Sequence, residues 1–406
     1  MKLAKVLAAV TAAMICASCV WEVVLPAVTR DAGVSAFATE PAPEPPAPIR
    51  LLSGYMPEAA TDYTMYLPGA GEPIKAIYVS ASHASSSALF EKRMRIALET
   101  EVNAIVFDIK ETDGVVSFKG IPRADELGVS SDYIKDIKGF IKNMRDNDIY
   151  VIGRLVALKD DTITKLFPDF GLRLANGEYF REAPIRVNGK SYPSPTWLNP
   201  YNRDVWNYLA ELAEGAAMLG FDEIQFDYLR FPSSSKIKDA RFGDTGGLSR
   251  EEIIAEMTGY LADRIRPYGV KVAVDVYGTI VLSDLDASIV GQDFALMAQK
   301  LDFICPMPYP SHFAEGSMGV QYPDLDPYQT IYRFMQACSS RLDGVENAAT
   351  VRTWLQDFSA PWIDHWQDYD AKQVREQVNA VYDAGYDGWM LWSSGGYNSE
   401  GGLLRE

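Results

Sequence analysis

Short apolar, β-branched runs alternate with longer amphipathic stretches along most of the chain after residue 72. Runs of four to eight such residues are typical of buried strands, and apolar residues repeating every three to four positions are typical of helices. The predicted strands are 75–80, 103–109, 149–156, 222–227, 270–276, 301–306, 348–354 and 387–392. The predicted helices are 86–100, 132–146, 202–219, 250–266, 288–299, 328–341 and 372–384.

The predicted helix 202–219 shows the clearest pattern of this kind. Its apolar positions fall on one helical face at Val205, Leu209, Leu212 and Ala216. Gly220 follows in a position where glycine commonly ends a helix. No eighth helix follows the last predicted strand, so either the fold lacks it or segment 51–72 covers that side.

Regular alternation of strand and helix predicts a parallel sheet with right-handed crossovers. Eight units fit a (β/α)8 TIM barrel, and a doubly wound open sheet is the alternative. Helix-to-strand connections are minimal, whereas the strand-to-helix connections 157–201, 228–249 and 307–327 are long. Long loops on one side are typical of the C-terminal face of a barrel. No glycine-rich phosphate loop follows the first strand, which argues against a nucleotide-binding Rossmann fold.

The N-terminus has the pattern of a targeting segment. Two lysines among the first five residues precede an uncharged apolar run at 6–21, and Ala36-Phe37-Ala38 offers a cleavage site. We expect residues 1–38 to be a signal peptide or a membrane anchor. The chain would then be secreted, or anchored to the extracytoplasmic face of a bacterial membrane.

A Pro/Ala/Glu-rich stretch at 39–50 follows the targeting segment. This composition is typical of an extended spacer. We therefore expect residues 39–72 to be a linker and N-terminal extension, and residues 73–406 to be one barrel domain. Such a spacer would hold the domain away from a membrane or a cell wall.

Composition narrows the function classes. Hydrophobic residues make up 48% of the chain, which is ordinary for a globular protein. The net charge of −17 argues against nucleic acid as a partner. It also argues against a polyanionic substrate, unless basic residues cluster locally. Of the four cysteines only Cys305 and Cys338 lie beyond the targeting segment, either as one disulfide or as two buried thiols.

Polar residues occur where the predicted strands end. In Glu-Ile-Gln-Phe-Asp, Gln225 and Asp227 alternate with Ile224 and Phe226, so the polar pair should point into the barrel. The same argument applies on neighbouring strands to Asp108, Lys110, Arg154 and Asp275. Charged groups pointing inward cost free energy unless they are paired, so their convergence indicates a polar site at the mouth.

Each of these groups has a functional and a structural interpretation. Asp227 is either a catalytic carboxylate or a salt-bridge partner of Arg230 or Arg154. Asp275 is the second candidate carboxylate, or it orients Asp227. Asp108 and Lys110 are expected to form an internal ion pair that positions substrate, and Arg154 to support a carboxylate electrostatically.

Aromatic side chains at the mouth add a hint about the substrate. Flat aromatic rings suit the apolar faces of sugars, although some of these residues would instead be core. The candidate substrate-binding aromatics are Tyr228, Tyr277, Tyr309, Trp354 and Trp392. The polar candidates for substrate binding are Asp108, Lys110, Arg154, Gln225 and Arg230. Trp389 is expected in the core.

Metal and nucleophilic-serine chemistry have weaker support. His83, His312 and His365 are the only histidines, and none has a partner at metal-ligand spacing. No Gly-x-Ser-x-Gly motif is present. We expect no bound metal and no cofactor.

Several runs together carry a family resemblance: KAIYVSASHASS, NAIVFDIKETDG, GFDEIQFDYLRFP, VRTWLQDF and DGWMLWSSGGYN. They resemble the "putative glycoside hydrolase domain" family of exported bacterial proteins, which is distantly related to α-galactosidase-like barrels. The resemblance covers about residues 73–400, and FDYLRFP at 226–232 is its most specific part. It implies a (β/α)8 barrel that acts on carbohydrate.

The resemblance also bears on the catalytic pair. Asp227 matches the nucleophile at the end of strand four in the related barrels. The α-galactosidase-like acid/base follows strand six, but this chain has CPMPYPSHF there, without a carboxylate. Polygalactosaminidase-like barrels, which are also similar, place an acidic partner after strand five, which makes Asp275 the first choice here.

The sequence therefore predicts a glycoside hydrolase that cleaves an extracellular or cell-envelope polysaccharide with two carboxylates. Asp227 would be the ionised nucleophile or base, and Asp275 the proton donor, buried near Tyr277. The alternatives are a non-catalytic glycan-binding or cell-envelope protein on the same barrel, and a metal-dependent deacetylase.

Overall fold

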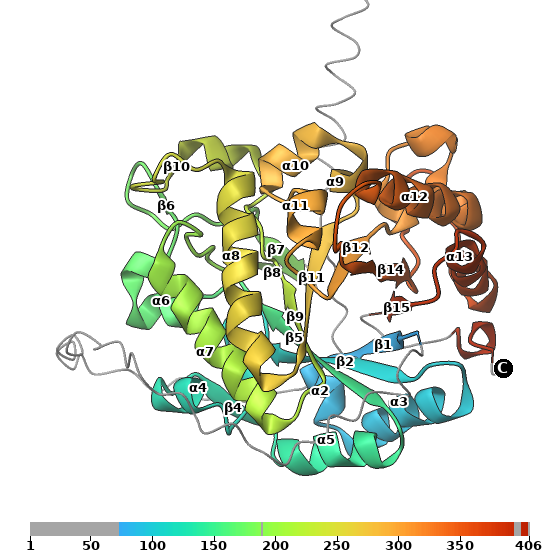
Figure 1. Cartoon of the computed structure of the whole chain (residues 1–406), viewed down its shortest axis with the longest axis horizontal. Helices are drawn as coiled ribbons and strands as arrows, with labels where there is room; N and C mark the ends of the chain where they lie inside the picture. The colour runs from blue at the N-terminus through green and yellow to red at the C-terminus, as the bar shows by residue number, and fades with distance from the viewer. Residues whose placement is uncertain (1–72, 188–189, 394–398, 405–406) are drawn as a thin grey trace, which may run out of the picture.

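The computed structural model describes residues 73–187, 190–393 and 399–404. The expected targeting segment 1–38 and the linker and extension 39–72 lie outside these residues. The described chain forms a barrel of parallel strands surrounded by helices (Figure 1).

The barrel strands follow one another around the sheet in chain order. They are β1 (Lys75–Val79), β2 (Ala104–Lys110), β5 (Tyr150–Val156), β9 (Glu223–Asp227), β11 (Lys271–Tyr277), β12 (Phe303–Met307), β13 (Thr350–Val351), β14 (Thr353–Gln356) and β15 (Trp389–Trp392). Strands β13 and β14 are two parts of one segment that is interrupted at Arg352. β13 pairs with β12, β14 pairs with β15, and β15 pairs with β1, so the sheet is nearly closed. The (β/α)8 prediction is confirmed over the open sheet.

Helices cover the outside of the strands, as Figure 1 shows. The longer ones are α3 (Ser87–Glu99), α5 (Ile137–Asp146), α7 (Arg203–Leu219), α8 (Arg250–Ile265), α12 (Pro327–Leu342) and α13 (Ala371–Asp383). The shorter ones are α2 (Ala81–Ala84), α4 (Pro122–Glu126), α6 (Ile163–Leu166), α9 (Thr279–Leu282), α10 (Asp284–Val290) and α11 (Phe294–Ala298). Gly220 ends α7 with φ 104°, a conformation that favours glycine, and Ser249 with Glu252 forms a capping box at the start of α8.

Two predicted helices differ from the structure. The helix expected at 132–146 begins only at Ile137, because residues 130–134 form strand β4 (Ser130–Ile134) beside β3 (Val116–Phe118). The helix expected at 288–299 is two helices, α10 and α11. Gly291, with φ 71°, ends α10. A local strand pairing and a glycine in the left-handed region thus override the helical pattern.

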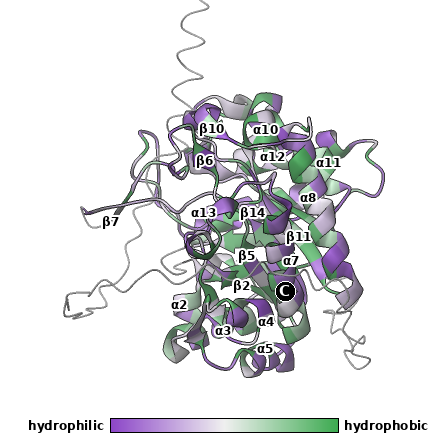
Figure 2. Cartoon of the chain, turned by 90° about the vertical axis from the view of Figure 1, so that its left-hand side faces the viewer, coloured by the Kyte–Doolittle hydropathy of each residue, from purple (hydrophilic) through white to green (hydrophobic). Residues whose placement is uncertain are grey.

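Two apolar clusters divide the strand side chains between the two faces of the sheet. Ile224, Phe226 and Trp389 lie in the larger cluster, which includes helix residues such as Leu209. Ala76, Val106, Ile152, Ala273 and Met390 form a second cluster inside the barrel. This is the alternation that the sequence predicts, and Trp389 is buried as expected. Figure 2 shows hydrophobic strands at the centre and hydrophilic positions on the surrounding helices.

The loops after the strands are long and partly structured. The loop after β5 contains β6 (Arg173–Leu174), β7 (Ile185–Val187) and β8 (Lys190–Tyr192). β6 pairs with β10 (Ala240–Arg241), which ties this loop to the loop after β9, and the β7–β8 hairpin forms a separate ladder. The long loop after β5 is therefore joined to the loop after β9 by strand pairing.

The two cysteines of the described residues, Cys305 and Cys338, are both buried free thiols, so they do not form a disulfide. None of the helices in the described ranges is long and apolar enough to span a membrane.

Candidate active site

A pocket of about 160 Å³ lies where the strands end, and most of the candidate residues line it. Its predicted members are Arg154, Asp227, Tyr228, Arg230, Asp275, Tyr277, Tyr309, Trp354 and Trp392. Gly278, Thr279, Met307, His312 and Phe313 complete the lining. The pocket combines two carboxyl groups, two guanidinium groups and a largely aromatic wall.

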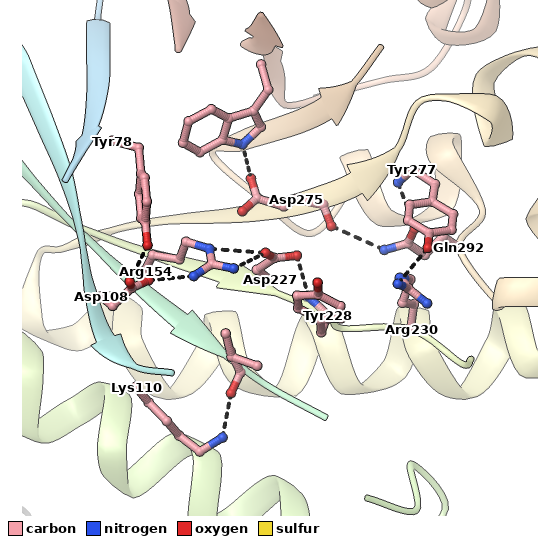
Figure 3. Close-up of polar contacts among 12 residues, drawn as sticks. Tyr78, Asp108, Lys110, Arg154, Asp227, Tyr228, Arg230, Asp275, Tyr277 and Gln292 are labelled. Atoms are coloured by element: carbon pink, nitrogen blue, oxygen red, sulfur yellow. Dashed lines mark hydrogen bonds and ion pairs between the residues drawn. The ribbon is translucent and has the colours of Figure 1, made fainter. Parts of the chain in front are cut away.

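Arg154 connects two carboxyl groups at the mouth of the barrel (Figure 3). It donates to Asp227 Oδ2 from Nε at 3.1 Å and from Nη2 at 2.5 Å, and to Asp108 Oδ1 from Nη1 at 2.5 Å. The Tyr78 hydroxyl group donates a 2.5 Å hydrogen bond to Asp108 Oδ2. Asp227 Oδ1 accepts the backbone N–H of Tyr228 at 2.6 Å. Asp227 is therefore held at both oxygens, by a charged guanidinium group on one and by a backbone N–H on the other.

Asp275 has a different environment. Only 2% of it is exposed, and the Trp354 indole N–H donates a 2.6 Å hydrogen bond to its Oδ1. Burial, followed by the nearby charge of Asp227, raises its pKa well above the usual range of aspartate. Such a group keeps its proton at a pH where an ordinary aspartate is ionised.

The two carboxyl groups project from neighbouring strands at matching heights. β9 and β11 pair in a constant register, with Gln225 opposite Ala273 and Phe226 opposite Val274. Asp227 and Asp275 are the next residues along each strand. Neighbouring strands lie about 4.8 Å apart, so the two side chains start close together and converge on one pocket.

Gln292 fixes the backbone around Asp275. Its side-chain amide donates to the Asp275 carbonyl at 3.2 Å and to the Leu229 carbonyl at 3.3 Å. Its oxygen accepts the backbone N–H of Tyr277 at 3.0 Å. One buried side chain therefore joins the end of β11 to the loop after β9.

The loop after β9 begins with a strained residue. Tyr228 has φ 55°, which is uncommon for a residue with a side chain, and its N–H bond to Asp227 supports the turn. The turn leads to Arg230, which donates to the Tyr277 hydroxyl at 2.7 Å and to the Phe231 carbonyl at 2.9 Å. Arg230 makes no ion pair with Asp227, so Arg154 alone fills the salt-bridge role that the sequence left open between them.

Aromatic rings form the wall opposite this loop. Trp392 stacks on Tyr78 with ring centroids 4.2 Å apart, and Trp354 meets Trp392 edge-on at 5.6 Å. The Arg154 guanidinium lies 5.5 Å from the Trp392 ring centroid. Tyr309 is buried in the lining, and burial, followed by the charges of Asp275 and Asp227, raises the pKa of its hydroxyl group well above 10.0.

The structure corrects the expected pairing of Asp108 with Lys110. Lys110 is fully buried, forms a 3.0 Å ion pair with Asp160, and donates to the Val156 carbonyl at 2.7 Å. Figure 3 shows it pointing away from the carboxyl cluster. The pairing of β2 with β5 changes register between Asp108 and Lys110, so simple alternation fails there. Lys110 supports the strand ends and does not line the pocket.

Asp108 and Gln225 also lie outside the pocket lining. Asp108 lies behind Arg154, which occupies one of its oxygens. Gln225 is fully buried in the barrel and donates to the Met390 sulfur at 3.2 Å. Both residues therefore lie beneath the pocket, and they affect it through the side chains that they contact, Arg154 and Met390.

Sequence reasoning missed several residues at the site. Tyr78 falls on the inward face of β1 with Ala76, so strand alternation could have found it. Met307 likewise falls on the inward face of β12 with Cys305. Gln292 and His312 carry no such signal, because their positions depend on loop conformation. His312 is exposed to solvent where it lines the pocket.

The histidines lie apart in the structure. His312 lines the pocket, whereas His365 contacts Glu315 through Nδ1 at 2.5 Å. Across residues 73–187, 190–393 and 399–404, no three His, Cys, Asp or Glu side chains form a group that could hold a metal ion.

Comparisons with known proteins agree with this architecture. No curated protein matches the chain. A hypothetical protein from Ruminiclostridium thermocellum is 36% identical over 49% of this chain and 97% of its own length, with a TM-score of 0.43. The glycoside hydrolase domain of PgaB (BpsB) from Bordetella bronchiseptica is similar over 79% of this chain and 94% of its own, at 15% identity and a TM-score of 0.54.

The β-amylase catalytic domain from Paenibacillus polymyxa is similar over 81% of this chain and 95% of its own, at 11% identity and a TM-score of 0.50. These two distant likenesses concern the fold. Residues 76–397 match the family model described as "Putative glycosyl hydrolase domain". The chain therefore belongs to this glycosyl hydrolase domain family.

Proposed function

We propose that this protein is a glycoside hydrolase that cleaves a polysaccharide with Asp227 and Asp275. The observation that carries the proposal is the contrast between the two carboxyl groups in one pocket. Asp227 is paired with Arg154, whereas burial raises the pKa of Asp275. Glycoside cleavage needs one ionised and one protonated carboxyl group, and different environments supply that difference.

In the proposed reaction Asp275 donates its proton to the oxygen of the leaving sugar. Asp227 attacks the anomeric carbon, and the glycosidic C–O bond breaks as the bond to Asp227 forms. Asp275, now ionised, removes a proton from water, which attacks the anomeric carbon and releases Asp227. Each residue ends in its starting state, and the net change is addition of one water molecule across the bond.

Arg154 would be a positioning residue in this scheme. Its three donated hydrogen bonds fix Asp227 relative to Asp108, and its positive charge offsets the negative charge of the nucleophile. Trp392, Trp354 and Tyr309 line the pocket and would present flat surfaces to a sugar ring.

We also propose that the protein acts outside the cytoplasm. The N-terminal pattern of a charged start, an apolar run and a proline-rich spacer supports export, with the barrel secreted or held at the extracytoplasmic face of a bacterial membrane. The substrate would then be an extracellular or cell-envelope polysaccharide.

The test is to incubate the purified protein with a panel of envelope and exopolysaccharides, amino-sugar polymers included. Both the release of reducing ends and the retention of protein on each polymer are measured. Release from at least one polymer is expected. Tight retention on a polymer without release from any of them would overturn the hydrolase and favour the alternative, a non-catalytic glycan-binding protein with the same aromatic pocket.

A further inference from the structure

Arg230 is a buried cation in the wall of the candidate active-site pocket. Only 4% of the residue is exposed, yet it lines the pocket together with Asp227 and Asp275. It follows β9 by three residues, after the strained turn at Tyr228. A charged group at this position costs free energy unless something pairs with it.

Within the part of the chain that the structure describes, the contacts of Arg230 are all with neutral groups. Nη1 donates to the Phe231 carbonyl and Nη2 to the Tyr277 hydroxyl. The guanidinium carbon lies 4.0 Å from the Tyr277 ring centroid, 5.0 Å from that of Trp197 and 5.1 Å from that of Tyr228. These contacts fix the plane of the guanidinium group without neutralising its charge.

Other buried cations of the barrel are paired differently. Arg154 contacts Asp108 and Asp227, Lys110 contacts Asp160, and Arg352 contacts Glu223. No carboxylate among the described residues lies within ion-pair distance of Arg230. Glu182, whose charge also acts on Arg230, is paired with Lys159 at 2.9 Å.

Lys159 adds a second positive charge to the same wall. Its ammonium nitrogen lies 4.3 Å from the Tyr228 ring centroid, whereas the Arg230 guanidinium lies 5.1 Å from the same centroid. Two cations and one carboxylate therefore share the aromatic cluster of Tyr228 and Trp197. This is a local excess of positive charge in a chain whose net charge is −17.

We propose that Arg230 binds an anionic substituent of the substrate sugar, so that the polysaccharide is an acidic one. The shared chemistry is a carboxylate or ester sulfate that accepts parallel hydrogen bonds from the guanidinium group. A uronic acid and a sulfated sugar both supply it. The proposal rests on the proposed function for the role of the pocket, and it names the class of substrate.

The charge balance of the pocket is compatible with an anion at this position. Arg154 is shared between Asp227 and Asp108, burial raises the pKa of Asp108, and the raised pKa of Asp275 keeps that group neutral. An anionic substituent beside Arg230 would therefore meet the one guanidinium group in the pocket lining that the described residues leave without a carboxylate.

The experiment measures binding by calorimetry with three sets of oligosaccharides: uronic-acid, sulfated and neutral. It compares the wild type with Arg230→Gln, and with Arg241→Gln as a matched control from an exposed position on the same loop. Acidic oligosaccharides should bind the wild type more tightly than neutral ones. Arg230→Gln should weaken that binding by about 10- to 100-fold and leave neutral binding unchanged, whereas Arg241→Gln should change neither.

The uronic-acid and sulfated arms identify which anion binds. Equal affinity of the wild type for neutral and acidic oligosaccharides would overturn the proposal, and this result does not depend on any variant folding. An equal loss of neutral and acidic binding in Arg230→Gln would also overturn it.

The result for the anionic subsite can be distinguished from the result for hydrolase activity. Cleavage of a neutral polymer alone would leave the proposed function standing and remove the anionic subsite. Arg230-dependent binding of an acidic oligosaccharide, without cleavage of any polymer, would support the subsite and remove the hydrolase.

Discussion

Arg154 donates two hydrogen bonds to a single oxygen of Asp227, from Nε at 3.1 Å and from Nη2 at 2.5 Å. The third nitrogen of the guanidinium group holds Asp108, which Tyr78 also contacts. The planar fork therefore sets the distance between two carboxyl groups on different strands. An ammonium group cannot reproduce this geometry.

We expect Arg154→Lys to retain the buried positive charge but to lose the position of Asp227. The kcat should fall by about 100-fold while KM changes little, because a small misplacement of a reacting group acts mainly on the chemical step. Steady-state kinetics on one defined substrate separates the two parameters, and thermal unfolding checks the fold. A rise in KM with unchanged kcat would instead make Arg154 a substrate contact.

The raised pKa of Asp275 predicts the basic limb of the pH–rate profile. In the proposed mechanism the active form has Asp275 protonated, so the rate should fall as the pH rises through its raised pKa. Asp275→Asn should lower kcat by about 10²- to 10⁴-fold and abolish that limb. For aryl glycosides with good leaving groups, kcat/KM should fall far less than for the polymer, because it reports the first step, which then needs little proton donation. An equal loss of kcat/KM on both would contradict the role of proton donor.

The same pKa shift has a consequence for stability. The pKa of Asp275 in the folded state lies above its value in the unfolded state. Its contribution to the free energy of unfolding is therefore fully present below the unfolded-state pKa and is lost as the pH rises through the folded-state pKa. The Asp275→Asn variant lacks this titration. Its unfolding free energy should therefore depend less on pH than that of the wild type across that range.

The register of β9 and β11 predicts the stereochemical outcome. Asp227 and Asp275 follow paired residues on neighbouring strands, about 4.8 Å apart, which suits the short separation of retaining enzymes better than the longer one of inverting enzymes. Proton NMR of the first product formed should show the anomeric configuration of the substrate. Initial formation of the opposite anomer would mean that water attacks directly.

Inside the barrel, below the pocket, Arg352 and Glu223 form a buried ion pair. Arg352 interrupts the segment that closes the sheet, and it donates from Nη1 to Glu223 Oε2 at 3.0 Å. Arg352→Met should lower the unfolding free energy by about 3–5 kcal/mol, because it leaves a buried carboxylate unpaired. Urea unfolding measures this loss, and Arg352→Met combined with Glu223→Gln should recover part of it. No recovery in the double variant would show that packing accounts for the loss.

The sequence predicted the barrel well because its strands are short apolar runs and its helix-to-strand turns are minimal. Alternation within β9 correctly separated Ile224 and Phe226 from Gln225 and Asp227. These patterns depend on local periodicity, which a single sequence displays directly.

Prediction failed where distant residues decide the local structure. The Asp108–Lys110 pair was wrong because the register of β2 against β5 shifts between them. The start of α5 was wrong because residues 130–134 pair with β3. Gln292 joins groups on β11 and on the loop after β9, and no spacing in the sequence indicates these contacts.

The central claim is that Asp227 carries out the chemistry in this pocket, and the most direct test is the turnover of Asp227→Asn on the polymer that the wild type cleaves. The variant should fold, bind the polymer and release reducing ends at least about 10³-fold more slowly at saturation. Asparagine preserves the shape of the side chain, and thermal unfolding verifies the fold. Turnover by Asp227→Asn at the wild-type rate would contradict the account.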